Sequence, residues 1–321
     1  MKNEKDYLYN MNSYLELISF FILSLILAFT VQKIFITYRK FDNFNHRTSH
    51  NVLATKTGGI SFFISLLIFT LFYYYKGTEI FDFSLMIPLS IMFIVGVYDD
   101  FYEADFKLKF LLQIIVSKII IDQGYVIDSF QGIFGIYELP WIIAQLFTSF
   151  VFLVIVNSLN FIDGIDGLAI TEVIKVIIII ELISIENTPI YYLGLLTITG
   201  LLPLYYYNFK KNKKIFLGDA GSLLLGTLIS IYIFNIFNSS YIIKESFNIN
   251  KAVFSIILFI YPLTDLLRIF IIRISQKKSP FIADNNHLHH KLLKKNFNHF
   301  LSTLTIQVLS LVLLLTYLFL S

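Results

Sequence analysis

Apolar residues gather into ten long runs that are separated by short polar segments. A helix needs roughly 20 apolar residues, within about 17–25, to cross the hydrocarbon core of a bilayer. The pattern therefore predicts an all-α polytopic membrane protein with about ten transmembrane helices, and residues 1–321 are expected to form a single domain. The predicted spans lie at about 14–37, 58–75, 83–97, 109–124, 141–158, 168–186, 189–207, 217–238, 251–273 and 298–320.

Alternate crossing of the membrane places five loops on one face. These loops lie at about 38–57, 98–108, 159–167, 208–216 and 274–297, and they hold most of the lysine and arginine outside the apolar runs. The opposite face has only Lys2, Lys5, Lys76 and Lys244, with Lys251 at a helix edge. The positive-inside rule makes the basic face cytoplasmic and puts both termini outside.

The outer loop at 125–140 differs from the other loops in composition. Its sequence, GYVIDSFQGIFGIYEL, places Gly132 and Gly135 among β-branched and aromatic residues. This pattern predicts a small periplasmic hairpin on the outer surface.

Composition agrees with a membrane protein and excludes some other classes. The chain is 56% hydrophobic and 15% charged, whereas a soluble domain is usually about 45–50% apolar. A net charge of +3 is too small to indicate nucleic-acid binding. Because the chain has no cysteine, disulfides and thiolate metal sites are excluded.

Four polar clusters fall on the predicted cytoplasmic face. They are Asp99–Asp100, NSLNFIDGIDGL at 157–168, FLGDAGS at 216–222, and DNNHLHH at 284–290. Carboxylates that lie close together raise one another's pKa unless a cation relieves them. Mg²⁺ prefers oxygen ligands and typically takes one or two carboxylates together with substrate phosphates. The clusters therefore indicate Mg²⁺ and phosphate chemistry on the cytoplasmic face.

Glycines in two of the clusters support the same chemistry. DGIDG and GDAGS each run straight into a predicted helix, and a helix N-terminus offers free N–H groups to phosphate. Each cluster alone also has a structural explanation, as a solvated loop, a turn, a helix cap or surface histidines. The lysines at 210–214 are explained most simply as a topology signal. The Asp265–Arg268 pair is as easily structural as catalytic. The occurrence of all four clusters on one face favours a single site.

In order along the chain, these motifs resemble the polyprenyl-phosphate N-acetylhexosamine-1-phosphate transferases, the WecA-, TagO- and MraY-like enzymes of glycosyltransferase family 4. The resemblance begins at Arg47 and Gly58–Gly59 and continues through Asp99–Asp100 and KFLLQ at 109–113. It then runs through NSLNFIDGIDGL, FLGDAGS, the segment 262–268 and HLHH. It implies a fold of about ten helices with a cytoplasmic active-site cleft. It also implies that the phosphate of a polyprenyl lipid attacks the β-phosphorus of a UDP-sugar and that UMP leaves.

The resemblance also implies roles for individual residues. Asp219 is the expected Mg²⁺ ligand, with Mn²⁺ as the alternative ion. Asp99 is the expected base and Phe216 the expected partner of uracil. The expected catalytic residues are Asp99, Asp100, Asp163 and His290. The expected substrate-binding residues are Arg47, Lys56, Lys109, Asn157, Asn160, Asp166, Phe216, His287 and His289.

HLHH resembles the WecA-, TagO- and WbpL-like branch, which favours a UDP-N-acetylhexosamine donor and undecaprenyl phosphate as acceptor. The chain departs from the family where it reads LATKTGG, since Lys56 stands where Pro-Arg is common. A phospho-MurNAc-pentapeptide transferase of the same superfamily, a membrane transporter and a non-catalytic scaffold are the alternatives. The resemblance further implies a bacterial inner-membrane protein and raises a homodimer as an expectation.

Overall fold

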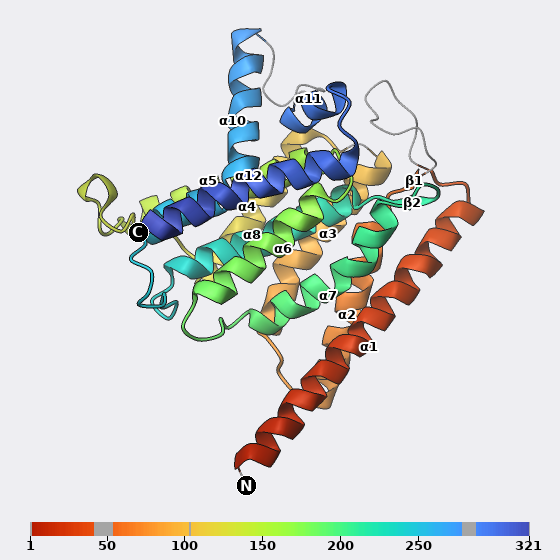
Figure 1. Ribbon diagram of the computed structural model, residues 1–321, viewed down its shortest axis with the longest axis horizontal. Helices are drawn as coiled ribbons and strands as arrows, with labels where there is room; N and C mark the ends of the chain where they lie inside the picture. Colours follow the sequence, from red (N-terminus) through yellow and green to blue (C-terminus); the bar gives the residue numbers. More distant parts are fainter. Residues whose placement is uncertain (1, 42–53, 103, 278–286, 321) are drawn as a thin grey trace.

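The computed structural model describes residues 2–41, 54–102, 104–277 and 287–320, which form a bundle of helices (Figure 1). Arg47 lies outside the described residues. The helices are α1 (Lys2–Thr37), α2 (Gly58–Lys76), η1 (Phe83–Leu85), α3 (Met86–Tyr102), α4 (Phe106–Asp122), η2 (Ile133–Gly135), α5 (Trp141–Ile162), α6 (Leu168–Ile183), α7 (Tyr191–Asn208), α8 (Gly218–Phe237), α9 (Lys251–Leu258), α10 (Ile260–Ser275), α11 (Leu288–Lys294) and α12 (His299–Leu320). Two short strands, β1 (Ala54–Thr55) and β2 (Lys214–Ile215), pair in parallel.

Every predicted span coincides with helical structure, and the chain is a multi-pass membrane protein. Within the described residues, six helices are long and apolar enough to cross a bilayer, or seven if the bent pair α9–α10 is one span. Two other predicted spans, α4 and α6, have only 17 and 16 residues. The number of ten spans is therefore not confirmed.

The loop at 125–140 contains the single 3₁₀ turn η2 and no strand. The Leu139 N–H donates to the Asp128 carbonyl over 2.8 Å and so brings the two arms of the loop together. Because neither arm forms a ladder of hydrogen bonds, the hairpin is not confirmed.

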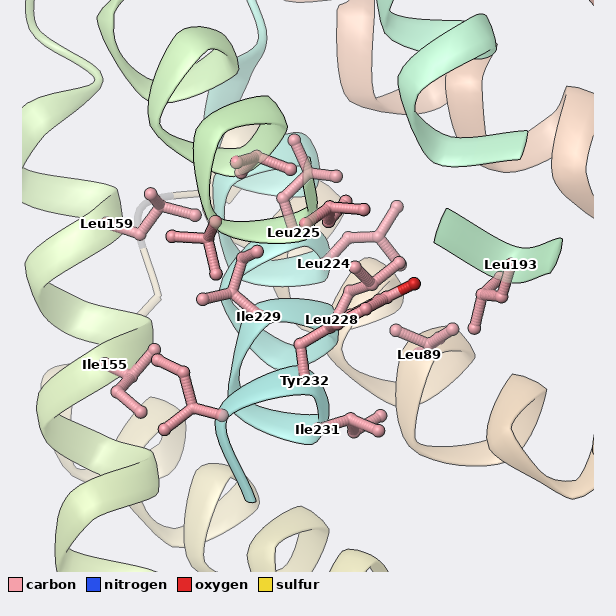
Figure 2. Close-up of a cluster of buried hydrophobic side chains, with 14 of the residues drawn as sticks. Leu89, Ile155, Leu159, Leu193, Leu224, Leu225, Leu228, Ile229, Ile231 and Tyr232 are labelled. Carbon is pink, nitrogen blue, oxygen red and sulfur yellow. The ribbon is translucent and has the colours of Figure 1, made fainter. Parts of the chain in front are cut away.

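Helix α8 lies at the centre of the bundle. All of its residues except Asp219 are buried. Figure 2 shows Leu224, Leu225 and Ile229 of α8 surrounded by side chains of neighbouring helices, including Ile155 and Leu159 of α5. This helix therefore meets protein on all sides, which explains why it is apolar around its whole circumference.

Glycines let three helices approach α8 at backbone distance. A Cβ atom on Gly59 of α2 would lie 2.1 Å from the Gly221 nitrogen, and one on Gly96 of α3 would lie 2.3 Å from the Asp219 carbonyl oxygen. On α8 itself, a Cβ on Gly226 would lie 2.9 Å from the Val156 Cα of α5. Small residues at helix contacts are typical of membrane proteins, where close van der Waals packing drives helix association.

The predicted span 251–273 is wrong as one straight helix. It is broken at Phe259 into α9 and α10, which are bent by 73°. Pro262 lies in the first turn of α10, where its missing N–H is tolerated, but it cannot donate the hydrogen bond that would continue α9. In Figure 1, α10 projects from the body of the bundle.

Strands β1 and β2 connect two loops that were predicted to share a face. Beyond the strands, the Gly58 N–H donates to the Phe216 carbonyl and the Gly59 N–H to the Leu217 carbonyl, over 2.9 and 2.8 Å. The paired strands and these two hydrogen bonds form a clip that holds the start of α2 against the start of α8. This contact agrees with the predicted placement of loops 38–57 and 208–216 on one face.

Substitution of Gly96 by valine should destabilise the protein and displace Asp219. Overpacking typically costs about 1–3 kcal/mol, and here the new side chain would collide with backbone and not with a flexible side chain. The temperature at which the purified protein aggregates should fall by several degrees. Gly77→Asn is the matched control, because Gly77 has a left-handed φ of 68° and open space around it. Equal stability of both variants would contradict the close α3–α8 contact.

Candidate active site

Asp100 and Asp219 meet at the N-terminus of α8. The sequence placed Asp100 in a loop after the third span, but α3 continues to Tyr102 and carries Asp99 and Asp100 in its last turns. The Ala220 N–H donates to Asp100 Oδ2 over 2.9 Å. This contact satisfies one of the first N–H groups of α8, which have no partner within the helix. The carboxylate of Asp100 therefore lies beside the residue that carries the Asp219 side chain.

Asn160 and Lys56 complete this corner of the site. Asn160 lies in the last turn of α5, and its Nδ2 donates to Asp219 Oδ1 and, over 2.7 Å, to Ser222 Oγ. Lys56 Nζ, which follows β1, is 3.4 Å from Asp100 Oδ1. The structure thus brings together residues from four separate segments of the chain.

Asp163 lies near two other carboxylates, Asp219 and Asp100. It caps the C-terminus of α5. Burial raises the pKa of Asp163 well above its usual value, and the carboxylates of Asp219 and Asp100 raise it further. Within the described residues, no lysine or arginine is within ion-pair distance of Asp163 or Asp219. Positive charge from a ligand or ion would relieve this repulsion.

Asp99 and Lys109 form an ion pair at the mouth of a cavity. Asp99 also accepts the Ala104 N–H over 2.9 Å. The cavity has a volume of about 470 Å³ and lies between α4, α5 and α10. Asn157 lines it, and its Nδ2 donates to Gln113 Oε1 over 2.8 Å. The cavity therefore joins apolar helix faces to this polar end of the bundle.

Asp166 has structural partners. It forms a buried ion pair with Lys214 of β2, and its N–H donates to His299 Nδ1 of α12 over 3.2 Å. Lys214 thus corrects the interpretation of residues 210–214 as a topology signal alone. The DGIDG loop is also held by Asn208, whose Oδ1 accepts the Gly167 N–H over 2.5 Å and whose Nδ2 donates to the Ile215 carbonyl over 2.9 Å. No local pattern marked Asn208, which follows a tyrosine run, as a partner of this loop.

The histidines lie against the DGIDG loop. His289 is fully buried, and a Cβ atom on Gly164 would lie 2.7 Å from its Nε2. His290 Nε2 would be 3.5 Å from the same point. Burial and the neighbouring imidazoles lower the pKa of His289 well below 6.5, and burial with His287 lowers that of His290 to about 4. Both rings are therefore neutral at pH 7 and act as hydrogen-bonding groups.

Asp265 positions the histidine loop. Its carboxylate accepts from His287 Nδ1 over 2.7 Å and from the Leu288 N–H over 2.9 Å, and Arg268 is 3.2 Å away. The sequence left the Asp265–Arg268 pair open between a structural and a catalytic role. In the structure this pair holds the start of α11, which presents His289 and His290 to Gly164.

The site suits an oxygen-binding cation held by few protein ligands. No group of three or more histidine or acidic side chains in the described chain is arranged to hold a metal. However, Asp219 and Asp163 supply hard oxygen donors that form no ion pair with a lysine or arginine of the described chain. Mg²⁺ commonly takes only one or two carboxylates beside phosphates. Phe216 is half-buried beside the clip, where its N–H donates to the Thr55 carbonyl. Its predicted stacking on uracil stays a prediction, as do the roles of the other site residues.

The fold and the site define a multi-pass membrane protein with a carboxylate-rich site at the ends of its helices. The model of glycosyl transferase family 4 matches residues 82–236, which run from before α3 to the end of α8. Over these residues the chain is similar to this family, in accord with its ordered motifs. The matched region includes Asp99, Asp100, Asn160 and Asp219, and the histidine loop lies beyond it.

Several curated relatives are similar over most of the chain. One is the probable undecaprenyl-phosphate N-acetylglucosaminyl 1-phosphate transferase of Bacillus subtilis (strain 168), with 29% identity over 89% of this chain and 78% of the relative. The undecaprenyl-phosphate alpha-N-acetylglucosaminyl 1-phosphate transferases of Thermotoga maritima and Escherichia coli (strain K12) are 27% and 26% identical. These alignments cover 87% and 88% of this chain and 80% and 77% of the relatives.

Substitution of Asp265 by asparagine should lower kcat by roughly ten- to a hundredfold, because a hydrogen bond to a charged group contributes about 1.5–3 kcal/mol. The amide can still accept the Leu288 N–H, but its NH₂ group faces His287 Nδ1 and reverses that hydrogen bond. Sugar-phosphate transfer by the purified protein would be measured beside its melting temperature. A large loss of melting temperature with unchanged kcat would show that Asp265 supports only the fold.

Proposed function

We propose that this protein transfers an N-acetylhexosamine 1-phosphate from a UDP-sugar to undecaprenyl phosphate and so starts a lipid-linked surface glycan. Its relatives in Bacillus subtilis and Escherichia coli are named as undecaprenyl-phosphate N-acetylglucosaminyl 1-phosphate transferases. The structural observation that carries the proposal is the junction between the cavity of about 470 Å³ and the carboxylate cluster.

The lining of the cavity has the chemistry that a lipid phosphate requires. Its walls are apolar, with Phe110, Leu153 and Phe270 among them, and its polar end holds Asp99, Lys109 and Asn160. Phe150, another wall residue, is 60% exposed on the lipid-facing side of α5. A prenyl chain would lie along the aromatic walls while its phosphate reaches Lys109. A site for two soluble substrates would have no need of such a lipid-facing wall.

The arriving phosphate would compete with Asp99 for Lys109. Once this ion pair is separated, Asp99 can accept the proton of the lipid phosphate. A phosphate oxygen then attacks the β-phosphorus of the UDP-sugar, and the bond from that phosphorus to the bridging oxygen breaks. UMP leaves with the bridging oxygen, and the product is a polyprenyl pyrophosphoryl sugar. Phosphoryl transfer of this kind needs mainly positioning and charge stabilisation.

The other end of the site would hold the diphosphate. Lys56, the N-terminus of α8 and the Asn160 amide surround Asp100 and Asp219. Asp219 is the residue we expect to bind Mg²⁺, with Asp163 and Asp100 nearby. When bound, the ion would neutralise charge on the diphosphate. Neutral His289 and His290 would donate hydrogen bonds to phosphate or sugar oxygens from the opposite side.

We place this site on the cytoplasmic face of the bacterial inner membrane. The basic loops lie on the same face as the site, in accord with the positive-inside rule. Nucleotide sugars are soluble, so a site at helix ends lets the soluble donor meet a membrane-bound acceptor.

The proposal is tested by release of UMP in the presence of undecaprenyl phosphate and Mg²⁺. Purified protein would be incubated with UDP-N-acetylglucosamine, UDP-N-acetylgalactosamine and UDP-MurNAc-pentapeptide. We expect turnover with at least one UDP-N-acetylhexosamine and none with the pentapeptide, and we expect it to stop when lipid or cation is removed. Turnover with the pentapeptide alone would assign the protein to the other branch, and failure with every donor would reject the proposal.

Substitution of Asp219 by asparagine should lower turnover by on the order of 10³-fold, since a metal clamp supplies several kcal/mol of transition-state stabilisation. The amide keeps the size of the side chain but removes the charge. Asp105→Asn, on an exposed residue at the start of α4, is the matched control and should stay near wild-type activity. Near-normal turnover in Asp219→Asn would remove this residue from the cation site.

A further inference from the structure

A second cavity lies on the opposite side of α10 from the cavity assigned to the carrier lipid. It has a volume of about 440 Å³ and lies between α10, α11 and α12. Leu266 and Phe270 of α10 line the first cavity, whereas Tyr261 and Thr264 line the second. Because a helix turns about 100° per residue, positions 264 and 266 point in nearly opposite directions. The two cavities are therefore separate, with α10 as their common wall.

The second cavity is apolar and reaches the lipid-facing surface. Its walls include Leu288 and Leu292 of α11 and Ile306 of α12. Leu309 and Leu313, also wall residues, are 60% and 55% exposed on α12. Exposed leucines on a spanning helix face acyl chains, so a chain from the bilayer can enter the cavity from the side. Its volume is within the range of about 300–1,000 Å³ that is usual for ligand sites.

Two lysines stand at the end of this cavity that lies near the histidine loop. Lys291 and Lys295 are four residues apart, at positions that share one side of a helix, and both are exposed. None of the residues that line the cavity is acidic, and within the described chain neither lysine forms an ion pair. An apolar groove that ends at two cations is complementary to an anionic lipid.

We propose that this cavity binds an anionic phospholipid of the surrounding bilayer, with one acyl chain along α12 and its phosphate against Lys291 and Lys295. The carrier lipid fits less well, because its phosphate must reach the carboxylate cluster and neither Asp99 nor Asp219 lines this cavity. A zwitterionic lipid carries no net charge to complement the lysines, and free phosphate has no chain to fill the groove.

The bound lipid would stabilise the helix that carries the histidines. Tyr261 lines the cavity, and its hydroxyl is 3.2 Å from His289 Nδ1. Leu288, another wall residue, donates its N–H to Asp265. Filling the cavity therefore supports α11 from the side opposite Gly164. We therefore expect the bound lipid to increase turnover. This increase rests on the proposed function, whereas lipid binding itself does not.

The test uses the full chain in nanodiscs made of phosphatidylcholine alone or with 30% phosphatidylglycerol added, a composition of about one anionic lipid in three. Bound lipid is counted by native mass spectrometry after release into detergent. The variants are Lys291→Gln/Lys295→Gln, which removes the charges, and Thr264→Trp, which fills the groove. Lys211→Gln/Lys213→Gln is the matched control, because it removes two exposed lysines from another loop of the same face.

We expect one retained phosphatidylglycerol per chain in the wild type and in the control. The Lys291→Gln/Lys295→Gln variant should bind it roughly thirtyfold more weakly, because each lysine near an anionic surface contributes about a fivefold factor. Thr264→Trp should lose it although both lysines remain. Wild-type retention in either variant would overturn the proposal, and so would displacement of the lipid by equimolar undecaprenyl phosphate. Because this count needs no turnover, it is independent of the outcome with UDP-sugars.

Discussion

The backbone contact between the start of α8 and helices α2 and α3 is the constraint on which the site depends. Gly59 meets Gly221, and Gly96 meets the Asp219 carbonyl, at distances that leave no room for a side chain. In a bilayer, apolar side chains gain little from leaving lipid, so such close packing has to hold the helices together. Because the contact includes the Asp219 backbone, the same packing holds the helices of the bundle together and sets the position from which the Asp219 side chain projects. The Ala220 N–H then fixes Asp100 beside it.

The carboxylates at this end of the bundle fall into two groups by their partners. Asp166 is paired with Lys214, and Asp265 with His287 and Arg268, so both hold loops in place. Asp163 and Asp219 have no such cationic partner among the described residues, and the two raise one another's electrostatic energy. Carboxylates held close together without a cation are costly. That cost is the physical reason to expect positive charge from outside the protein at Asp163 and Asp219 and not at Asp166 or Asp265.

The break at Phe259 directs α10 so that each of its two sides lines a cavity. A straight helix would have continued inside the bundle, whereas α10 leaves it at 73° to α9 and has a cavity on each side. One face leads to Lys109 and Asp99, and the other leads to Lys291 and Lys295. Between them, Tyr261 and Asp265 contact the histidine loop. The bend thus connects the lipid-facing surface of the protein to the helix that carries His289 and His290.

The sequence by itself determined the membrane class of the protein, the approximate position of most helices and the four polar clusters, and it indicated the similarity to glycosyl transferase family 4. These features depend on local composition and on motifs, since a run of apolar residues has to be covered by lipid or protein wherever it lies. The end of α3, the break at Phe259 and the absence of strands at 125–140 escaped prediction, because helix ends and bends depend on which backbone groups find partners elsewhere.

Only the tertiary structure decided which residues meet. Three contacts join segments that are far apart in the chain. Lys214 pairs with Asp166, Asn208 accepts a hydrogen bond from the DGIDG loop, and Asp265 accepts one from His287. A lysine in a basic run or an asparagine after a helix has no local pattern that reveals its partner. Hydrogen bonds and ion pairs reach only about 3–4 Å, so their partners are fixed by the packing of helices and not by neighbours in sequence.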